Sequence, residues 1–209
     1  MAILCVENAG SCQAVAELLP SMRWVTRAAR FLGVCGDSRR IRRICELRDI
    51  PFANDHLDAF LNATTDAAPV PQNLIRAASA AGAWACPISV IRNHAMRIAE
   101  RLALPDCVFP LARLCLGWPS REGFVSLRLH MALTAHVDRY DDTNLAAEID
   151  GYDRRRDARH SIPESDWRQV ERFGKPSFYG WSEDKARQVS VPERQDFGAF
   201  IRRQGFKLD

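Results

Sequence analysis

The sequence predicts an α+β fold in which short strands come first and charged helices follow. Two apolar runs, residues 2–6 and 30–35, have the length and composition of buried strands. A third apolar run, residues 108–119, is long enough for a central strand and ends in Gly-Trp-Pro. From Asp142 onward the chain is rich in charge and has helical spacing. Strands followed by helices indicate a layered α+β fold whose C-terminal segment extends over another surface.

Caps and apolar spacing predict the first helices. Asp37 is placed to cap a helix with an apolar stripe and an arginine-rich outer face. The stripe consists of Ile41, Ile44, Cys45 and Leu47, and the outer face of Arg39, Arg40, Arg42 and Arg43. A second helix is expected from about Asp55. Pro69 and Pro71 interrupt the pattern before residues 72–76 start another helix, because proline lacks an N–H and restrains the preceding residue.

The middle of the chain alternates between extended and helical segments. Residues 84–91 are expected to form a strand or an extended loop, and Asn93 to cap a helix that ends at Pro105. Residues 131–136 predict a further strand. In the charged C-terminal part, breaks between helices are expected near Pro163, residues 174–176 and residues 191–192.

Length and charge limit the possible classes of protein. The chain has 209 residues, of which 47% are hydrophobic, enough for one core and a single domain. The net charge of +3 is spread among acidic residues, so no nucleic-acid partner is expected. The longest uncharged apolar stretch, residues 77–91, is too short to span a membrane, and residues 1–7 lack the basic start of a signal peptide. A cytoplasmic protein is therefore expected.

Cysteine and histidine spacing argues against metal chemistry. The seven cysteines form no C-x-x-C pair, and we expect them to be buried, reduced thiols. The five histidines show no H-x-x-x-H spacing, so no zinc site is predicted. The glycine cluster at residues 33–38 matches neither a nucleophile elbow nor a phosphate-binding loop.

Residues 108–119, Val-Phe-Pro-Leu-Ala-Arg-Leu-Cys-Leu-Gly-Trp-Pro, resemble a strand motif of the NADPH-dependent, oxygen-insensitive nitroreductase and flavin reductase family. Five further segments resemble motifs of the same family. They are Pro71–Asn73, Ile91–His94, Ser126–Leu129, Trp181–Glu183 and Pro192–Phe206. By this resemblance, which covers residues 2–206, the chain is identified as a member of the nitroreductase family.

The resemblance implies a nitroreductase-like fold, a central, mostly antiparallel sheet wrapped by helices. It also implies a homodimer with FMN at the interface and hydride transfer from NAD(P)H to nitroaromatics, quinones or flavins. The single domain, residues 1–209, would comprise a core over residues 1–140 and a helical extension over residues 141–209 that covers the dimer partner. Four apolar residues of the extension have spacing suited to that contact, namely Phe197, Phe200, Ile201 and Phe206.

The resemblance also implies the residues of the site. Those expected to bind the cofactor are Pro87, Ile88, Ser89, Arg92, Ser126 and Arg128. Arg194 matches an arginine on the side of the substrate and nicotinamide. For Arg92 a second role, holding its loop in place, is equally open. The chemistry requires no acid–base dyad and no metal.

The sequence departs from the family pattern at the expected flavin site. The family's R-S-x-R phosphate-binding motif belongs to a segment that would precede Met1, and Ser126 stands where the family has a lysine. Pro87-Ile88-Ser89-Val90 stands where the family has small residues beside the ring, so a β-branched residue replaces a glycine that allows close backbone approach. These differences favour a weakened or altered flavin site. The alternatives are a non-catalytic dimeric scaffold or small-ligand binder of the same fold, and a natural chain that begins upstream of Met1.

Overall fold

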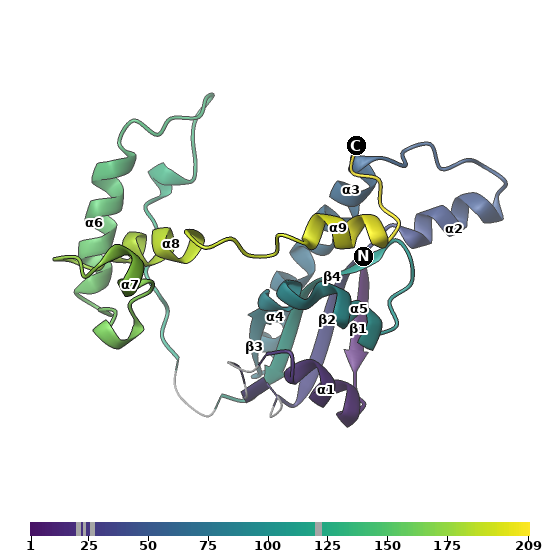
Figure 1. Cartoon of the computed structure of the whole chain (residues 1–209), viewed down its shortest axis with the longest axis horizontal. Helices are drawn as coiled ribbons and strands as arrows, with labels where there is room; N and C mark the ends of the chain where they lie inside the picture. The colour runs from purple at the N-terminus through teal and green to yellow at the C-terminus, as the bar shows by residue number, and fades with distance from the viewer. Residues whose placement is uncertain (20–21, 23, 26–27, 120–122) are drawn as a thin grey trace. The chain divides into compact units, whose positions relative to one another are not determined.

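The computed structural model describes residues 1–19, 22, 24–25, 28–119 and 123–209, which fall into two compact units. The first unit comprises Met1–Glu122 and Arg194–Asp209, and the second comprises Gly123–Glu193 (Figure 1). The expected boundary at residue 140 differs from this division. The chain leaves the sheet after the third apolar run, and its last residues return to the first unit.

A four-stranded antiparallel sheet forms the centre of the first unit. Its order is β1 (Ala2–Val6), β2 (Arg30–Asp37), β4 (Val108–Gly117) and β3 (Trp84–Ile88). The strands expected from the three apolar runs are confirmed, and the longest of them is an inner strand. Because β3 lies at an edge of the sheet, Pro87 can occupy it despite lacking a backbone donor.

Strand β4 contains a bulge. Val34 pairs with Ala112 and Cys35 with Pro110, so Leu111 has no partner residue on β2. Proline within a sheet is found mainly at edges and bulges, since it cannot donate to the ladder. Pro110 therefore explains locally why the register shifts at this position.

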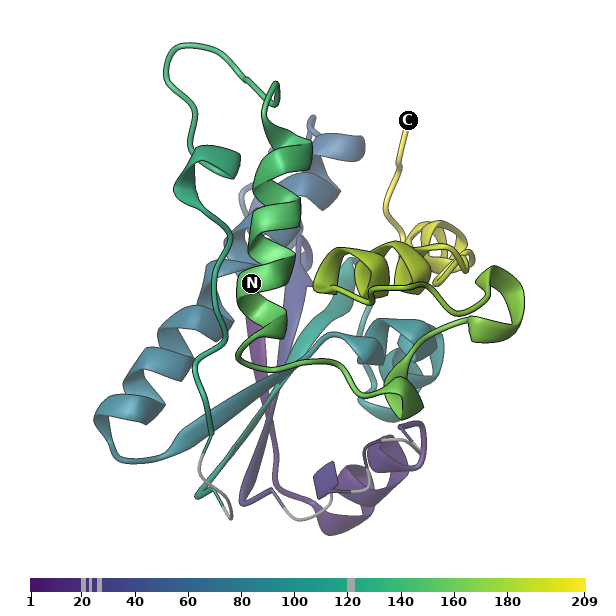
Figure 2. The same ribbon diagram turned by 90° about the vertical axis from the view of Figure 1, so that its left-hand side faces the viewer.

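Helices cover both faces of this sheet, with α4 on one side and α1 and α5 on the other (Figure 2). The helices of the first unit that lie near the sheet are α1 (Ala9–Ala16), α3 (Leu57–Ala67), α4 (Pro69–Ala80), α5 (Ala95–Arg101) and α9 (Phe197–Arg203). The helix expected from about Asp55 is confirmed as α3. Pro69 starts α4 rather than delaying it to residue 72, because the first turn of a helix needs no intrahelical N–H donor.

Helix α2 (Arg39–Leu47) is amphipathic as expected, but its apolar stripe is not buried. The Asp37 carboxylate accepts a hydrogen bond of 3.1 Å from the backbone N of Arg40, as a capping side chain does. Ile41 is 47% exposed and Ile44 46% exposed. Among the described residues, this face of α2 is therefore left partly exposed.

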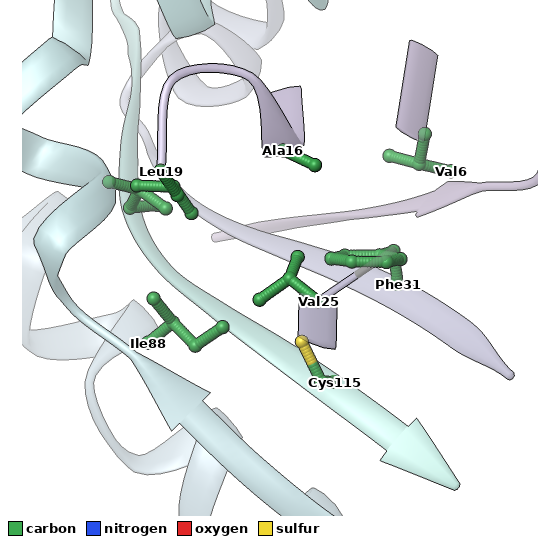
Figure 3. Packing of buried hydrophobic residues seen from close by; sticks show 8 residues of the cluster. Val6, Ala16, Leu19, Val25, Phe31, Ile88 and Cys115 are labelled. Atoms are coloured by element: carbon green, nitrogen blue, oxygen red, sulfur yellow. The ribbon is translucent and has the colours of Figure 1, made fainter. Parts of the chain in front are cut away.

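One core cluster lies between the sheet and α1 (Figure 3). Its buried residues are Val6, Ala16, Leu19, Val25, Phe31, Ile88, Ile91 and Cys115. They come from all four strands, from α1 and from the segments that follow α1 and β3. The β3 strand and the turn after it are thus anchored by their apolar side chains.

A second cluster is centred on Phe109, which is completely buried. The Phe109 ring lies 5.0 Å from that of Phe60 and 5.4 Å from that of Phe206. Gly36 makes room for it, since a Cβ there would lie 2.3 Å from the Phe109 ring. Phe200 and Ile201 are buried in the same cluster. The expectation that the C-terminal apolar residues cover a partner is therefore wrong for Phe200 and Ile201 of α9 and for Phe206 after it, which complete their own core.

The second unit is helical, as its charge pattern predicts. Its elements are η3 (Met131–Leu133), α6 (Leu145–Asp157), η4 (Glu164–Asp166), α7 (Val170–Phe173) and α8 (Trp181–Val189). The Asp153 carboxylate accepts a hydrogen bond of 3.0 Å from the backbone N of Ser182 and so joins α6 to α8. The expected breaks between helices are confirmed. The strand expected at residues 131–136 is wrong. These residues form η3 and irregular structure, and they do not pair with the strands of the described sheet.

All seven cysteines are free thiols. Cys35, Cys107 and Cys115 are buried as expected, whereas Cys5 and Cys86 are exposed. The expectation of burial is wrong for these two cysteines because both lie on edge strands of the sheet. Within the described ranges, no helix combines the length and the apolar character needed to cross a membrane.

Candidate functional site

The end of β3 and the turn η2 (Val90–His94) carry most of the residues expected to contact a cofactor. Pro87 and Ser89 are exposed at this end of the sheet. Ile88, between them, is 2% exposed and belongs to the core cluster. Its side chain therefore anchors the strand, and a ligand in this place would meet its backbone together with Pro87 and Ser89.

Arg92 fixes the turn to the sheet. Its Nη1 donates a hydrogen bond of 2.7 Å to the carbonyl oxygen of Leu111, the bulged residue of β4. Leu111 lies outside both ladders of β4, because pairing with β3 ends at Arg113. The loop-holding role of Arg92 is thus present in the structure, and the sequence signal for it is the proline that marks the bulge.

Arg194 approaches the same turn from the far end of the chain. Its Nε donates a hydrogen bond of 2.7 Å to Oδ1 of Asn93, across 101 positions of sequence. The expectation that Asn93 caps α5 is wrong: His94 occupies the position before the helix, and the Asn93 side chain binds Arg194. Asn93 therefore positions Arg194, whereas the sequence alone predicted only a helix cap.

The two arginines create a positive region beside the turn. Burial lowers the pKa of the Arg92 guanidinium, and the positive charge of Arg194 lowers it further. The two guanidinium groups therefore lie close enough for their charges to interact. Such a region attracts an anionic group, since a bound negative charge relieves the repulsion.

Helix α4 adds polar side chains near this edge of the sheet. Gln72 and Asn73 are exposed in its first turns, and α4 packs against β3. Amide side chains can both donate and accept, which suits a heterocycle with carbonyls and ring nitrogens. The first unit thus brings together Arg92, Arg194 and the exposed residues at the end of β3.

Ser126 and Arg128 are exposed residues of the second unit, in the irregular segment that follows Gly123. They lie in the same unit as Tyr152, whose hydroxyl donates a hydrogen bond of 3.0 Å to the carbonyl of Leu127. This bond holds the segment between Ser126 and Arg128 against α6. Ser126 and Arg128, on either side of Leu127, are both exposed.

Comparisons with known proteins relate the chain to nitroreductases and flavin reductases. The profile of the nitroreductase family, C-terminal domain, matches residues 126–209. The oxygen-insensitive NADPH nitroreductase of Salmonella typhimurium is 33% identical over 66% of this chain. The FMN reductase (NAD(P)H) of Bacillus subtilis is 25% identical over 99% of it. The solved structure of NfrA2 from B. megaterium superimposes with a TM-score of 0.84 at 27% identity and covers the whole chain.

The chain belongs to the nitroreductase family. Its fold is the nitroreductase fold, as the resemblance implied. The matched part spans 57% of the length of the Salmonella relative and 81% of the lengths of the Bacillus subtilis relative and of NfrA2.

Proposed function

We propose that this protein is an FMN-dependent NAD(P)H oxidoreductase. The observation that carries the proposal is the pair of guanidinium groups held at the turn after β3, Arg92 by Leu111 and Arg194 by Asn93. The names of the relatives support it, since they are an NADPH nitroreductase and an FMN reductase.

The residues at the end of β3 fit one face of an isoalloxazine ring. When bound, FMN accepts two electrons from NAD(P)H and passes them to an electron acceptor such as a nitroaromatic, a quinone or a flavin. Pro87 and Ser89 would lie along the ring with the backbone of Ile88. The positive field of Arg92 and Arg194 would favour negative charge on the nicotinamide and substrate side.

Arg128 would supply a charge-assisted donor to the anionic part of the cofactor. A phosphate group needs such donors to be held tightly. Ser126 offers only a hydroxyl where a lysine would add a second cation. We therefore propose a flavin site of weakened or altered affinity, which depends on Arg128 more than a site with both cations would.

We also propose that the working form is a homodimer. The exposed apolar stripe of α2 supports this, since such a face on a globular unit favours association.

The test is flavin uptake and turnover by the full chain. The protein is mixed with excess FMN, freed of unbound flavin and examined for flavin absorbance, and NADPH oxidation is then followed with a nitroaromatic acceptor. Arg194→Ala is expected to lower turnover, whereas Arg76→Ala, an exposed arginine of α4, serves as the matched control. Absence of both flavin uptake and FMN-dependent turnover in the unaltered protein would overturn the proposal.

The second candidate function is a non-catalytic dimeric binder of small ligands on the same fold. It is favoured by the missing lysine at Ser126 and by the buried side chain of Ile88. Ligand binding without FMN-dependent oxidation of NADPH would support it, and robust turnover would remove it.

A further inference from the structure

Arg113, in the middle of β4, carries a buried positive charge. Its side chain is 1% exposed, and Nε, Nη1 and Nη2 all lack a partner among the described residues. Its guanidinium carbon lies 5.2 Å from the centre of the Phe31 ring. An aromatic face offsets only part of the cost of burying a charge. The part of the chain that the structure describes therefore leaves this buried positive charge uncompensated.

Two cysteines face each other beside this charge. Cys86 on β3 and Cys115 on β4 are directly opposite in the antiparallel register. Residues so paired point to the same face of a sheet, with Cα atoms about 4.5–5.5 Å apart. Both are free thiols. Arg113 lies two residues before Cys115 on the same strand, and alternation places both on that face.

Cys86 and Cys115 both line one cavity of ≈ 520 Å³. Its other walls include Trp24, Trp84, Trp118 and Gly117. Cys86 is exposed, and Cys115 is 4% exposed at the inner side, where Figure 3 shows it packed beside Val25 and Phe31. A small ion could thus reach the pair from the cavity, while the inner thiol remains shielded from bulk water.

The thiols are protonated in the free protein. Burial raises the pKa of Cys115 to about 12, the neighbouring Cys86 also raises it, and the charge of Arg113 lowers it. Burial raises the pKa of Cys86 as well. Such thiols are poor nucleophiles, because the thiolate is the reactive form. A soft metal ion can still displace their protons, since a coordinating thiol is deprotonated.

We propose that Cys86 and Cys115 bind one soft monovalent cation of the Cu(I) and Ag(I) class as a two-coordinate bis-thiolate, with Arg113 as its countercharge. Binding replaces two S–H bonds by two sulfur–metal bonds and releases two protons, and no electrons are transferred. Two thiolates and a monovalent cation carry a net charge of −1. The guanidinium of Arg113 neutralises that charge inside the protein.

Charge and ligand number distinguish this site from sites for other metals. Thiolate sulfur selects soft ions such as Cu(I). A divalent ion between two thiolates would form a neutral complex and leave Arg113 uncompensated. Structural zinc takes four ligands, and the described part of the chain holds no cluster of three or more metal-binding side chains.

The experiment titrates the full chain, without flavin or nicotinamide, with Ag(I) and with Cu(I) in competition with a chromophoric Cu(I) chelator. Native mass spectrometry is expected to show one tightly bound ion per chain. Cys86→Ser should lose this binding, and Cys5→Ser, which alters the other exposed cysteine, should keep it. Equal affinity in Cys86→Ser and the unaltered protein would overturn the proposal. Because no flavin is present, this result is independent of the oxidoreductase activity.

A second variant tests the countercharge. Arg113→Met should weaken Ag(I) and Cu(I) binding by about 10- to 100-fold, the range typical of outer groups that tune a metal site. The same variant should change the affinity for Hg(II) much less, because the bis-thiolate of a divalent ion is neutral. Thermal unfolding of the metal-free variant checks that it is folded. Unchanged Ag(I) affinity in folded Arg113→Met would contradict the proposal.

Discussion

Nη1 of Arg92 lies 2.7 Å from the carbonyl oxygen of Leu111, and this contact joins the turn after β3 to the bulge of the inner strand β4. The bulge leaves that carbonyl outside the ladder, so it is available to a side chain. Asn93, the next residue, receives Arg194 from the C-terminal segment. The turn is therefore held by two contacts that local sequence does not encode.

Replacing Arg92 by alanine should destabilise the protein even without ligand. The lost hydrogen bond has a charged donor and is partly buried, which corresponds to about 1.5 kcal/mol. For a chain of this size the melting temperature should fall by about 3–6 °C. Arg97→Ala, an exposed arginine on α5, is the control and should leave it nearly unchanged. Equal melting temperatures for both variants would show that the Leu111 contact does not stabilise the fold.

Replacing Arg128 by alanine should weaken FMN binding by at least about tenfold, equivalent to about 1.4 kcal/mol. Arg128 is exposed, so the melting temperature should stay nearly the same. Fluorescence quenching of FMN measures both dissociation constants, with Arg139→Ala as a control in the same unit. Equal constants would make Arg128 an ordinary surface residue, and a collapsed melting temperature would make it structural.

Replacing Arg113 by methionine should stabilise the metal-free protein. The change removes a buried, unpartnered charge and keeps an unbranched side chain of similar length. Replacing buried charges by well-packed apolar groups is often stabilising, by about 1–4 kcal/mol. Urea unfolding measures the change, and Arg30→Met, at an exposed position of β2, is the control. A marked loss of stability in Arg113→Met would mean that the charge has a stabilising partner.

Stability should fall in acid through Asp55. Hydrogen bonds from Arg42 and Lys207 lower the pKa of this carboxyl from 3.8 to about 2. A lowered pKa in the folded state means that the stabilisation is complete above pH 3.8 and is lost as the pH falls toward about 2. Asp55→Asn should therefore reduce stability at neutral pH and flatten the decline in this window.

The control for Asp55 is Asp66→Asn, at an exposed position of α3. Chemical denaturation at a series of pH values compares the variants with the unaltered protein. If Asp55→Asn retains the full acid-dependent decline, the contacts of Asp55 with Arg42 and Lys207 do not contribute to it.

The intact chain should be a dimer by light scattering. Ile41→Glu combined with Ile44→Glu places charges on the exposed stripe of α2 and should shift the protein toward monomer, because a buried interface excludes unpaired charge. Arg159→Glu, on the surface of the second unit, introduces a similar charge change as a control. If the unaltered chain is a stable monomer, the predicted dimer is wrong. If the double substitution leaves a dimer intact, the α2 stripe is not its interface.

The sequence by itself determined three of the strands of the sheet, most helices and the family. Apolar runs of strand length correspond to β1, β2 and β4, and prolines mark the breaks between the C-terminal helices. These features depend on neighbours in the chain, so local patterns are sufficient to predict them. The motif of residues 108–119 and the motifs around it led to the correct family for the same reason.

Only the tertiary structure decided which residues act together. Asn93 looked like a helix cap until Arg194, 101 positions away, was found to bind it. The apolar residues in and after α9 were expected to cover a partner, yet Phe200 and Phe206 fill a cluster around Phe109. An apolar stripe shows that a face will be covered but not by what, since burial depends on segments distant in the chain. The sequence did not predict that Arg113 is buried for the same reason. Whether a charged side chain is buried or paired depends on which residues the fold brings next to it.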